Sequence, residues 1–265
     1  MPVVRKRFGQ NFLTDRHALQ RIADALQLEG HETVIEVGPG KGALTDLLVG
    51  RAARLACIEL DRDLVALLRE RYHDRPHVEI VSADVLEVDL PALAGGPFAL
   101  VGNVPYYITT PIIFHALRAP RPTRCVFLVQ REVAERLVAA PGTREYGALA
   151  VNVGLVADVE IAGPVGAGAF FPRPKVESAI VRITPRAVPR ALADEEAAVR
   201  AFVTGCFGQR RRQLPRAIRT VSGATAAQAA TAVAEAELDP LARPEDLSPD
   251  AFVALWRAVQ RALAA

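Results

Sequence analysis

Four consecutive residues, Asn103-Val104-Pro105-Tyr106, offer the chemistry that most narrows what this chain could do. They end the apolar run 98–102, which predicts a buried strand. The side-chain oxygen of Asn103 and the backbone carbonyl of Val104 can each accept a hydrogen from an exocyclic NH2 group. Pro105 restricts φ and holds that carbonyl in place, and Tyr106 offers a ring face for stacking. Alone, the segment favours an ordinary turn. In the context that follows, it suits a flat heteroaromatic amine such as adenine.

That context comes from three earlier predicted strand ends. Gly38, Gly40 and Gly42 lie between a strand and a helix, where glycine lets the backbone turn tightly and approach a ligand. Glu59 ends the next strand, where an acid often takes ribose hydroxyls, and Asp84 follows the third strand, where it could accept from an adenine amino group. Each acid alone is typical of a solvated loop. The loop and both acids at consecutive strand ends indicate a nucleoside site.

A nucleoside site of this kind is consistent with NAD or with S-adenosylmethionine. The glycines do not follow the G-x-G-x-x-G spacing of dinucleotide enzymes, because the third falls one position early. Hydride transfer does not need an amine-binding clamp, whereas methyl transfer to a base amine does. No proton-transfer histidine lies near a plausible pocket, which further disfavours a dehydrogenase. The sequence therefore predicts S-adenosylmethionine as the cofactor and residues 103–106 as the catalytic clamp.

The elements that must position these residues alternate along the chain. Helices are predicted over 14–26, 43–49 and 62–72. A fourth helix is predicted to begin at Thr110, and a fifth to follow the strand at 126–129 and end at residue 137. Apolar runs predict strands at 33–37, 55–59, 78–81, 98–101, 126–129, 156–161 and 179–183. This alternation is typical of an α/β protein with a parallel, doubly wound sheet.

From about residue 186 the pattern changes to helices alone. Pro185, Pro189 and the acidic residues 194–196 separate the sheet from a region that contains no convincing strand. Helices are predicted there over 195–202, 212–220, 226–236 and 248–263, with Pro215 tolerated in a first turn. The sequence thus predicts a catalytic sheet domain over residues 1–185 and a small all-helical domain over residues 186–265.

The distribution of charge indicates an RNA-binding role for the helical domain. A net charge of +2 is too small to argue for nucleic acid, but residues 197–234 contain no acid. An isolated arginine is typical of a solvated helix face, whereas Arg210-Arg211-Arg212 at a helix start suggests phosphate contacts. Residues 5–7 form a second basic cluster. The arginines of the acid-free stretch are Arg200, Arg210, Arg211, Arg212, Arg216 and Arg219.

Several protein classes are disfavoured by composition. The chain has no run of 18 apolar residues and no apolar core in its first residues, so neither a membrane span nor a signal peptide is expected. Cys57, Cys125 and Cys206 are far apart, which indicates core thiols in a reducing compartment. The histidines lack ligand spacing, so no metal is expected. We expect a cytoplasmic monomer.

An ordered set of motifs closely resembles the KsgA-type rRNA adenine N6,N6-dimethyltransferases over nearly the whole chain. Residue 104 departs from the family, which commonly carries leucine where Val104 stands, but only the backbone carbonyl is needed. The stretch 207–212 is similar as well. The matching segments are Phe8–Leu13, Glu36–Gly40, Ile58–Asp61, Asp84, Asn103–Tyr106 and Phe170–Ser178.

The resemblance implies a Rossmann-like methyltransferase sheet domain that dimethylates two adjacent adenosines near the 3′ end of small-subunit (16S) rRNA, within an assembling 30S particle. It implies that Tyr106 and Phe170 hold the flipped target adenine. The cofactor pocket would comprise Gln10, Asn11, Leu13, Gly38, Glu59, Asp84 and Asn103, and the glycine loop adds Gly40.

Two relatives of that family remain as alternatives. Antibiotic-resistance enzymes dimethylate a large-subunit rRNA adenine with a similar sheet domain, but segments 8–13 and 170–178 and the helical tail are more similar to the small-subunit group. A ribosome-assembly or mitochondrial-type transcription factor could keep the fold without catalysis. The intact clamp at residues 103–106 and the intact acids argue against lost catalysis.

Overall fold

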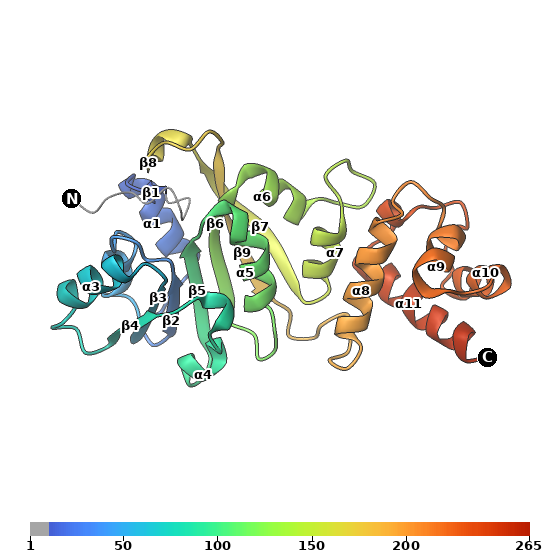
Figure 1. The fold of residues 1–265 in the computed structure, drawn as a ribbon, viewed down its shortest axis with the longest axis horizontal. Helices are drawn as coiled ribbons and strands as arrows, with labels where there is room; N and C mark the ends of the chain where they lie inside the picture. The colour runs from blue at the N-terminus through green and yellow to red at the C-terminus, as the bar shows by residue number, and fades with distance from the viewer. Residues whose placement is uncertain (1–10) are drawn as a thin grey trace. The chain divides into compact units, whose positions relative to one another are not determined.

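The computed structural model describes residues 11–265, and Gln10 and the basic cluster at 5–7 lie outside that range. The chain forms two compact units. Within the described residues, the sheet unit comprises 11–134 and Val159–Pro185, and the helical unit comprises Glu135–Asp158 and Arg186–Ala265. Figure 1 shows the strands of the first unit and the orange-to-red helices of the second.

The sheet unit is built on seven strands in the order β4-β3-β2-β5-β6-β9-β7 (Figure 1). Neighbours from β4 to β6 are parallel, and β9 runs antiparallel to β6. The predicted α/β class and its strands are confirmed, but the expectation of a wholly parallel sheet is wrong at β9. The strands are β2 (Thr33–Val37), β3 (Arg54–Glu59), β4 (Val78–Ser82), β5 (Phe98–Asn103), β6 (Arg124–Gln130), β7 (Ala157–Val165) and β9 (Ser178–Pro185).

The antiparallel strand has a simple cause. A parallel connection needs a crossover of a dozen or more residues, usually a helix. Between β7 and β9 the chain forms only the three-residue turn η4 (Ala167–Ala169) and the short strand β8 (Phe170–Phe171). Without a crossover helix, the chain returns in the opposite direction along β6.

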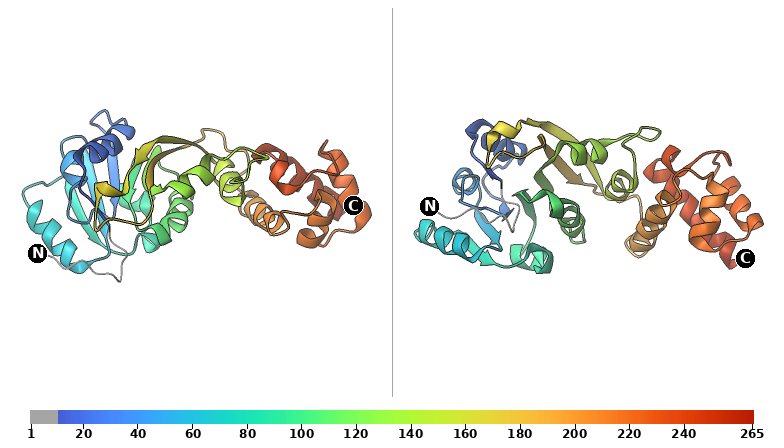
Figure 2. Two further views of the ribbon diagram at one scale, coloured as in Figure 1. Left: turned by 90° about the horizontal axis from the view of Figure 1, so that it is seen from above. Right: turned by 45° about the horizontal axis from the view of Figure 1, so that its top comes forward.

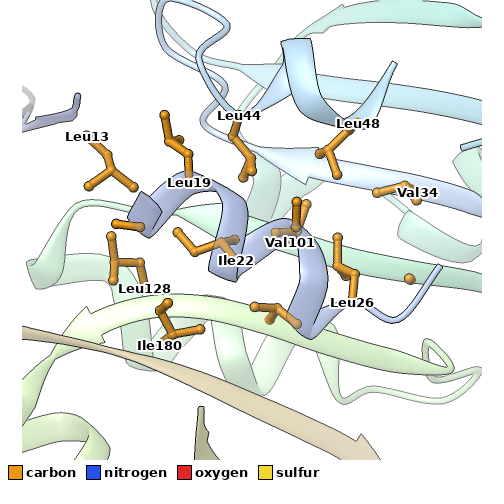
Figure 3. Packing of buried hydrophobic residues seen from close by; sticks show 14 of the residues in the cluster. Leu13, Leu19, Ile22, Leu26, Val34, Leu44, Leu48, Val101, Leu128 and Ile180 are labelled. Carbon is orange, nitrogen blue, oxygen red and sulfur yellow. The ribbon is translucent and has the colours of Figure 1, made fainter. Parts of the chain in front are cut away.

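Helix α1 (Arg16–Ala25) fixes the core beside the site. Asp15 caps it by accepting from Ala18 N at 2.7 Å, as the predicted start at Thr14-Asp15 requires. Leu19, Ile22 and Leu26 recur at helical spacing and are buried among the strands (Figure 3). Each such side chain stabilises the fold by roughly 1.5–3 kcal/mol.

Further helices follow the strands β2 to β6; those after β2, β3, β5 and β6 were predicted, and α4 was not. They are α2 (Thr45–Leu48), α3 (Arg62–Arg71), α4 (Leu90–Ala94), α5 (Thr109–Ala116) and α6 (Arg131–Val138). The cysteines at 57, 125 and 206 are buried and form no disulfide, as expected for core thiols.

A two-stranded sheet was not predicted. Strand β1 (Phe12–Leu13) pairs antiparallel with β8 (Phe170–Phe171), so that Leu13 lies opposite Phe170 and Phe12 opposite Phe171. Successive side chains of a strand point to opposite faces. Leu13 and Phe170 enter the core, and their neighbours do not. Two-residue strands are too short for any periodicity to reveal.

The helical unit gathers α7 (Ala148–Gly154), α8 (Glu196–Phe207), α9 (Leu214–Ser222), α10 (Ala226–Glu235) and α11 (Pro249–Ala264), and Figure 2 gives two further views. Pro215 lies in the first turn of α9, as predicted. Residues 135–158 join this unit although the sequence placed them in the sheet domain. Asn152 Nδ2 donates to Thr204 Oγ1 at 3.1 Å, and the Tyr146 hydroxyl to the Leu247 carbonyl at 2.6 Å. Within residues 11–265, no helix is both long and apolar enough to span a membrane.

Candidate active site

A cavity of about 590 Å³ opens at the carboxyl ends of β2, β3, β4 and β5. This is the edge at which parallel α/β sheets bind ligands, and the volume is in the range of small-molecule sites. Most residues predicted for the site meet here. They are Asn11, Leu13, Gly38, Gly40, Glu59, Asp84, Asn103, Val104, Pro105 and Tyr106.

Glu59 holds the glycine loop to the end of β3. Its Oε2 accepts from Gly40 N at 3.1 Å, and its Oε1 accepts from Leu60 N and Asp61 N, each at 2.9 Å. A carboxylate offers about four acceptor positions. Three are used by backbone, so one position on Oε2 remains for a ligand. Burial raises the pKa of Glu59, and the backbone hydrogen bonds oppose that rise.

Asp84 accepts a hydrogen bond from the backbone and also lines the cavity. Its Oδ1 accepts from Leu86 N at 3.0 Å and so caps the short helix η2 (Val85–Glu87). Oδ2 has no hydrogen-bond partner among residues 11–265 and is available to a ligand amine.

The predicted amine clamp has two free acceptors. Asn103 ends β5, and its Nδ2 donates to the backbone carbonyl of Asn11 at 3.4 Å, which leaves Oδ1 as an acceptor. The neighbouring carbonyl of Pro105 accepts from Ile108 N at 3.1 Å. By contrast, the carbonyl of Val104 accepts no hydrogen bond within the described part of the chain. Residues 103 and 104 therefore present one side-chain oxygen and one backbone oxygen without a partner, the two acceptors that the predicted clamp would need.

Tyr106 is held by a residue to which the sequence assigned no role. Its hydroxyl is 2.6 Å from Oγ of Ser178, which is fully buried at the start of β9. Burial raises the pKa of Tyr106, so the phenol stays protonated at neutral pH. The hydrogen bond joins the clamp to the end of segment 170–178, which the resemblance had singled out only as a motif.

A second unassigned residue, Glu36, is buried at the cavity. Its Oε2 accepts from Thr45 Oγ1 at 2.7 Å and from Cys57 Sγ at 3.6 Å. Burial raises the pKa of Glu36 to about 7. An acid within the otherwise apolar strand 33–37 is the sequence signal that could have revealed it.

The two aromatic residues of β8 differ in position. Phe170, which the resemblance assigns to the target base, is 4% exposed, packs in the core and does not line the cavity. Phe171 lines the cavity instead. Strand alternation places the side chains of Phe170 and Phe171 on opposite faces of β8, so one packs in the core while the other stays outside it. The role of Phe170 toward the base stays a prediction.

The three predicted RNA-contacting arginines lie in the helical unit and differ from one another. Arg210 is ion-paired with Glu245, and its Nη2 donates to the Arg144 carbonyl at 3.0 Å. Arg211 and Arg212 are exposed and form no ion pair within residues 11–265. Arg210 therefore holds the turn before α9, while its two neighbours stay available.

Comparison with known proteins agrees with this geometry. The ribosomal RNA adenine dimethylase family matches residues 2–256. The chain is 42% identical over 261 residues to ribosomal RNA small subunit methyltransferase A of Geobacter metallireducens, covering 96% of this chain and 95% of that one. It is 42% identical over 254 residues to the Pseudomonas aeruginosa protein of the same name, covering 95% and 92%.

Solved structures agree on the fold. The 23S rRNA methyltransferase ErmE superposes with a TM-score of 0.74 and 30% identity, covering 94% of this chain and all of that one. A dimethyladenosine transferase from Plasmodium falciparum superposes with a TM-score of 0.77 at 22% identity, covering 95% and 98%, which supports the fold alone. The predicted methyltransferase fold is confirmed, and the chain belongs to the ribosomal RNA adenine dimethylase family.

Proposed function

We propose that the chain transfers methyl groups from S-adenosylmethionine to N6 of two adjacent adenosines near the 3′ end of small-subunit rRNA, giving N6,N6-dimethyladenosine in an assembling subunit. The observation that carries this proposal is the pair of free acceptors, Asn103 Oδ1 and the Val104 carbonyl, at a nucleoside-sized cavity. The small-subunit relatives at 42% identity support the choice of RNA. We also propose that the protein acts as a monomer.

The groups at the cavity fit S-adenosylmethionine. Glu59 Oε2 can accept from a ribose hydroxyl and Asp84 Oδ2 from the adenine amino group. A Cβ at Gly40 would lie 3.2 Å from the ring of Phe12, so glycine lets this ring pack closely against the loop. Asn11 also lines the cavity. When bound, the cofactor supplies an electrophilic methyl group on a sulfonium.

The contribution of the chain to catalysis is to orient an amine. The N6 lone pair of adenine is delocalised into the ring, which makes it a poor nucleophile. Acceptors at Asn103 and Val104 would take both amine hydrogens and draw the nitrogen toward tetrahedral geometry. After transfer the amine carries a positive charge and is acidic enough to lose a proton to water. No general base is required.

The target base must leave its stack to reach the clamp. The ring of Tyr106 would replace part of the lost stacking, and its hydrogen bond to Ser178 would hold that ring at one angle. The second transfer requires room beside Asn103 for the methyl group that is already attached. These residues would bind and orient the base, and none would form a covalent bond to it.

RNA phosphates would contact the arginines of the helical unit that make no ion pair. The paired arginines of this unit are Arg186, Arg190, Arg200, Arg210, Arg257 and Arg261. Seven exposed arginines of this unit have no ion pair in the described chain, and Arg136, Arg144 and Arg243 are three of them. The other four lie close together in the sequence and are here called the free-arginine face: Arg211, Arg212, Arg216 and Arg219. Arg216 and Arg219 line a groove of about 700 Å³ on α9. Such contacts position the RNA, and the cavity selects the base.

The test is transfer of labelled methyl groups to unmodified small ribosomal subunits, with large subunits in parallel and the modified base identified. Asn103→Ala should lower kcat by about 10²–10³-fold, the loss typical of one preorganised polar group, with S-adenosylmethionine affinity only modestly weakened. Asn152→Ala, the same change in the helical unit, should leave transfer unchanged in the folded protein.

Three outcomes would contradict parts of the proposal. Near-normal turnover by Asn103→Ala would refute the clamp. Label in the large subunit would instead indicate a 23S rRNA methyltransferase, which is the activity that the name of ErmE states. Cofactor binding without transfer to either subunit would favour a non-catalytic assembly factor.

A further inference from the structure

Two aromatic side chains stand apart from all others in residues 11–265. Tyr107 is 68% exposed and Phe171 is 66% exposed, and every other described phenylalanine, tyrosine or tryptophan is buried or partly buried. Both exposed rings line the cavity that contains Asn103. Burying apolar surface is favourable, so two exposed rings at one cavity indicate a contact that folding does not supply.

The backbone places both rings outside the core. Tyr107 lies in the short helix η3 (Tyr106–Ile108), directly after the residue that Ser178 anchors. Phe171 follows the core residue Phe170 in β8, and the alternation of the strand directs it to the other face. Neither ring takes part in an aromatic pair or a cation–π contact within the described chain. Their only shared surroundings are the cavity.

We propose that Tyr107 and Phe171 form an outer stacking site for the RNA base next to the target adenine. This inference rests on the proposed function. A base drawn into the clamp brings its covalently linked neighbour to the mouth of the same cavity, where a flat apolar ring is the surface that a nucleobase stacks on. When two adjacent adenosines are modified, the second adenosine occupies the outer site while the first is in the clamp.

Kinetics on unmodified small ribosomal subunits test the outer site. Tyr107→Ala and Phe171→Ala should each raise KM by about 5- to 150-fold, the factor equivalent to ~1–3 kcal/mol of base–aromatic stacking. A contact made equally in the ground and transition states leaves kcat unchanged, so kcat should vary by less than about twofold. S-adenosylmethionine affinity, measured by calorimetry, should be unchanged.

Matched variants separate stacking from general apolar contact. Tyr107→Phe keeps a flat ring and should keep the wild-type KM. Tyr107→Leu keeps apolar bulk without a ring and should behave as Tyr107→Ala does. Leu241→Ala removes a side chain of the helical unit that is also 66% exposed but does not line the cavity, and this change should leave KM and kcat unaltered. Melting temperatures check that each variant is folded.

A substrate change identifies the base. Small subunits reconstituted with an abasic residue at one of the two adenosines should show a similarly raised KM for methylation of the other. Tyr107→Ala should then add no further loss, because the partner of the ring is already missing. Additive losses, an unchanged KM in both alanine variants, weaker cofactor binding or a fall in kcat would each overturn the outer site. Failure of the wild-type protein to methylate small subunits would instead refute the proposed function.

Discussion

The cavity of the sheet unit and the free-arginine face of the helical unit use their polar groups in opposite ways. Around the cavity, supporting groups are tied to one another: Glu59 to three backbone N–H groups, Glu36 to Thr45, and Tyr106 to Ser178. On the free-arginine face, four guanidinium groups are exposed without an acidic partner in residues 11–265.

The difference agrees with the roles that we propose for the two regions. Aiming one lone pair at a methyl group requires rigid positioning of the reacting groups. Phosphate contacts act through charge and tolerate mobile side chains. Substitutions among the supports of the cavity should therefore change stability or rate, whereas those on the free-arginine face should change RNA affinity and its salt dependence.

The largest of these effects is expected at Glu36, through pH. Its pKa of about 7 in the folded protein is above the ordinary value of 4.5 for a glutamate. Between these two pH values the folded state therefore retains a proton that the unfolded chain has lost. Its contribution to stability is complete below pH 4.5 and is lost as pH rises through 7. As pH rises from 5 to 8, the free energy of unfolding of Glu36→Gln should therefore increase by roughly 2–3 kcal/mol relative to that of the wild type.

Denaturant unfolding at several pH values measures this gain. Glu235→Gln, a change at a partly exposed acid of the helical unit, should show no comparable dependence. A stability difference between Glu36→Gln and the wild type that is flat from pH 5 to 8 would mean that Glu36 is ionised in the folded protein throughout.

The second effect should appear on the free-arginine face. Replacing Arg216 and Arg219 with glutamine removes two phosphate contacts and should weaken binding to small subunits. The slope of log K against log salt should fall by about 1.4–1.8, or about 0.7–0.9 for each contact. Cofactor affinity and melting temperature should not change. Titrations of labelled subunits at several salt concentrations give the slope, and an unaltered slope would place the RNA elsewhere.

Arg210→Gln provides the contrast within the same stretch of sequence. Loss of the ion pair with Glu245 and of the hydrogen bond to the Arg144 carbonyl should lower stability by roughly 1 kcal/mol. The salt slope should stay at the wild-type value. A reduced slope with unchanged stability would show that Arg210 contacts phosphate like its neighbours.

The smallest effect is expected at the support of the clamp. Ser178→Ala removes the partner of the Tyr106 hydroxyl, a hydrogen bond worth roughly 0.5–1.5 kcal/mol, and should lower kcat up to about tenfold. Tyr106→Phe should cause a similar loss, and the double variant should be no worse than either single one. Ser178→Thr keeps the hydroxyl and should restore part of the rate. Additive losses would show that the two residues act independently.

Much of the site follows from local sequence. Apolar runs locate the strands, and site residues at consecutive strand ends come together because the carboxyl ends of parallel strands share one edge. Gly38, Gly40, Glu59, Asp84 and Asn103 accordingly all line one cavity. The amide, the fixed proline and the aromatic ring at 103–106 are enough to suggest the proposed clamp, because their chemistry depends on residue type and order.

Long-range pairing decided the rest. Whether Phe170 or Phe171 reaches the cavity depends on the register with β1, about 160 residues earlier in the chain. Ser178 meets Tyr106 across 72 residues, and Arg210 is neutralised by Glu245 across 35. Helix α7 leaves the predicted sheet domain because its packing partners lie beyond residue 185. The sequence by itself determined the chemistry and the order of the strands along the chain. Only the tertiary structure decided which rings face the cavity and which charges stay free, because both depend on residues brought together from distant parts of the chain.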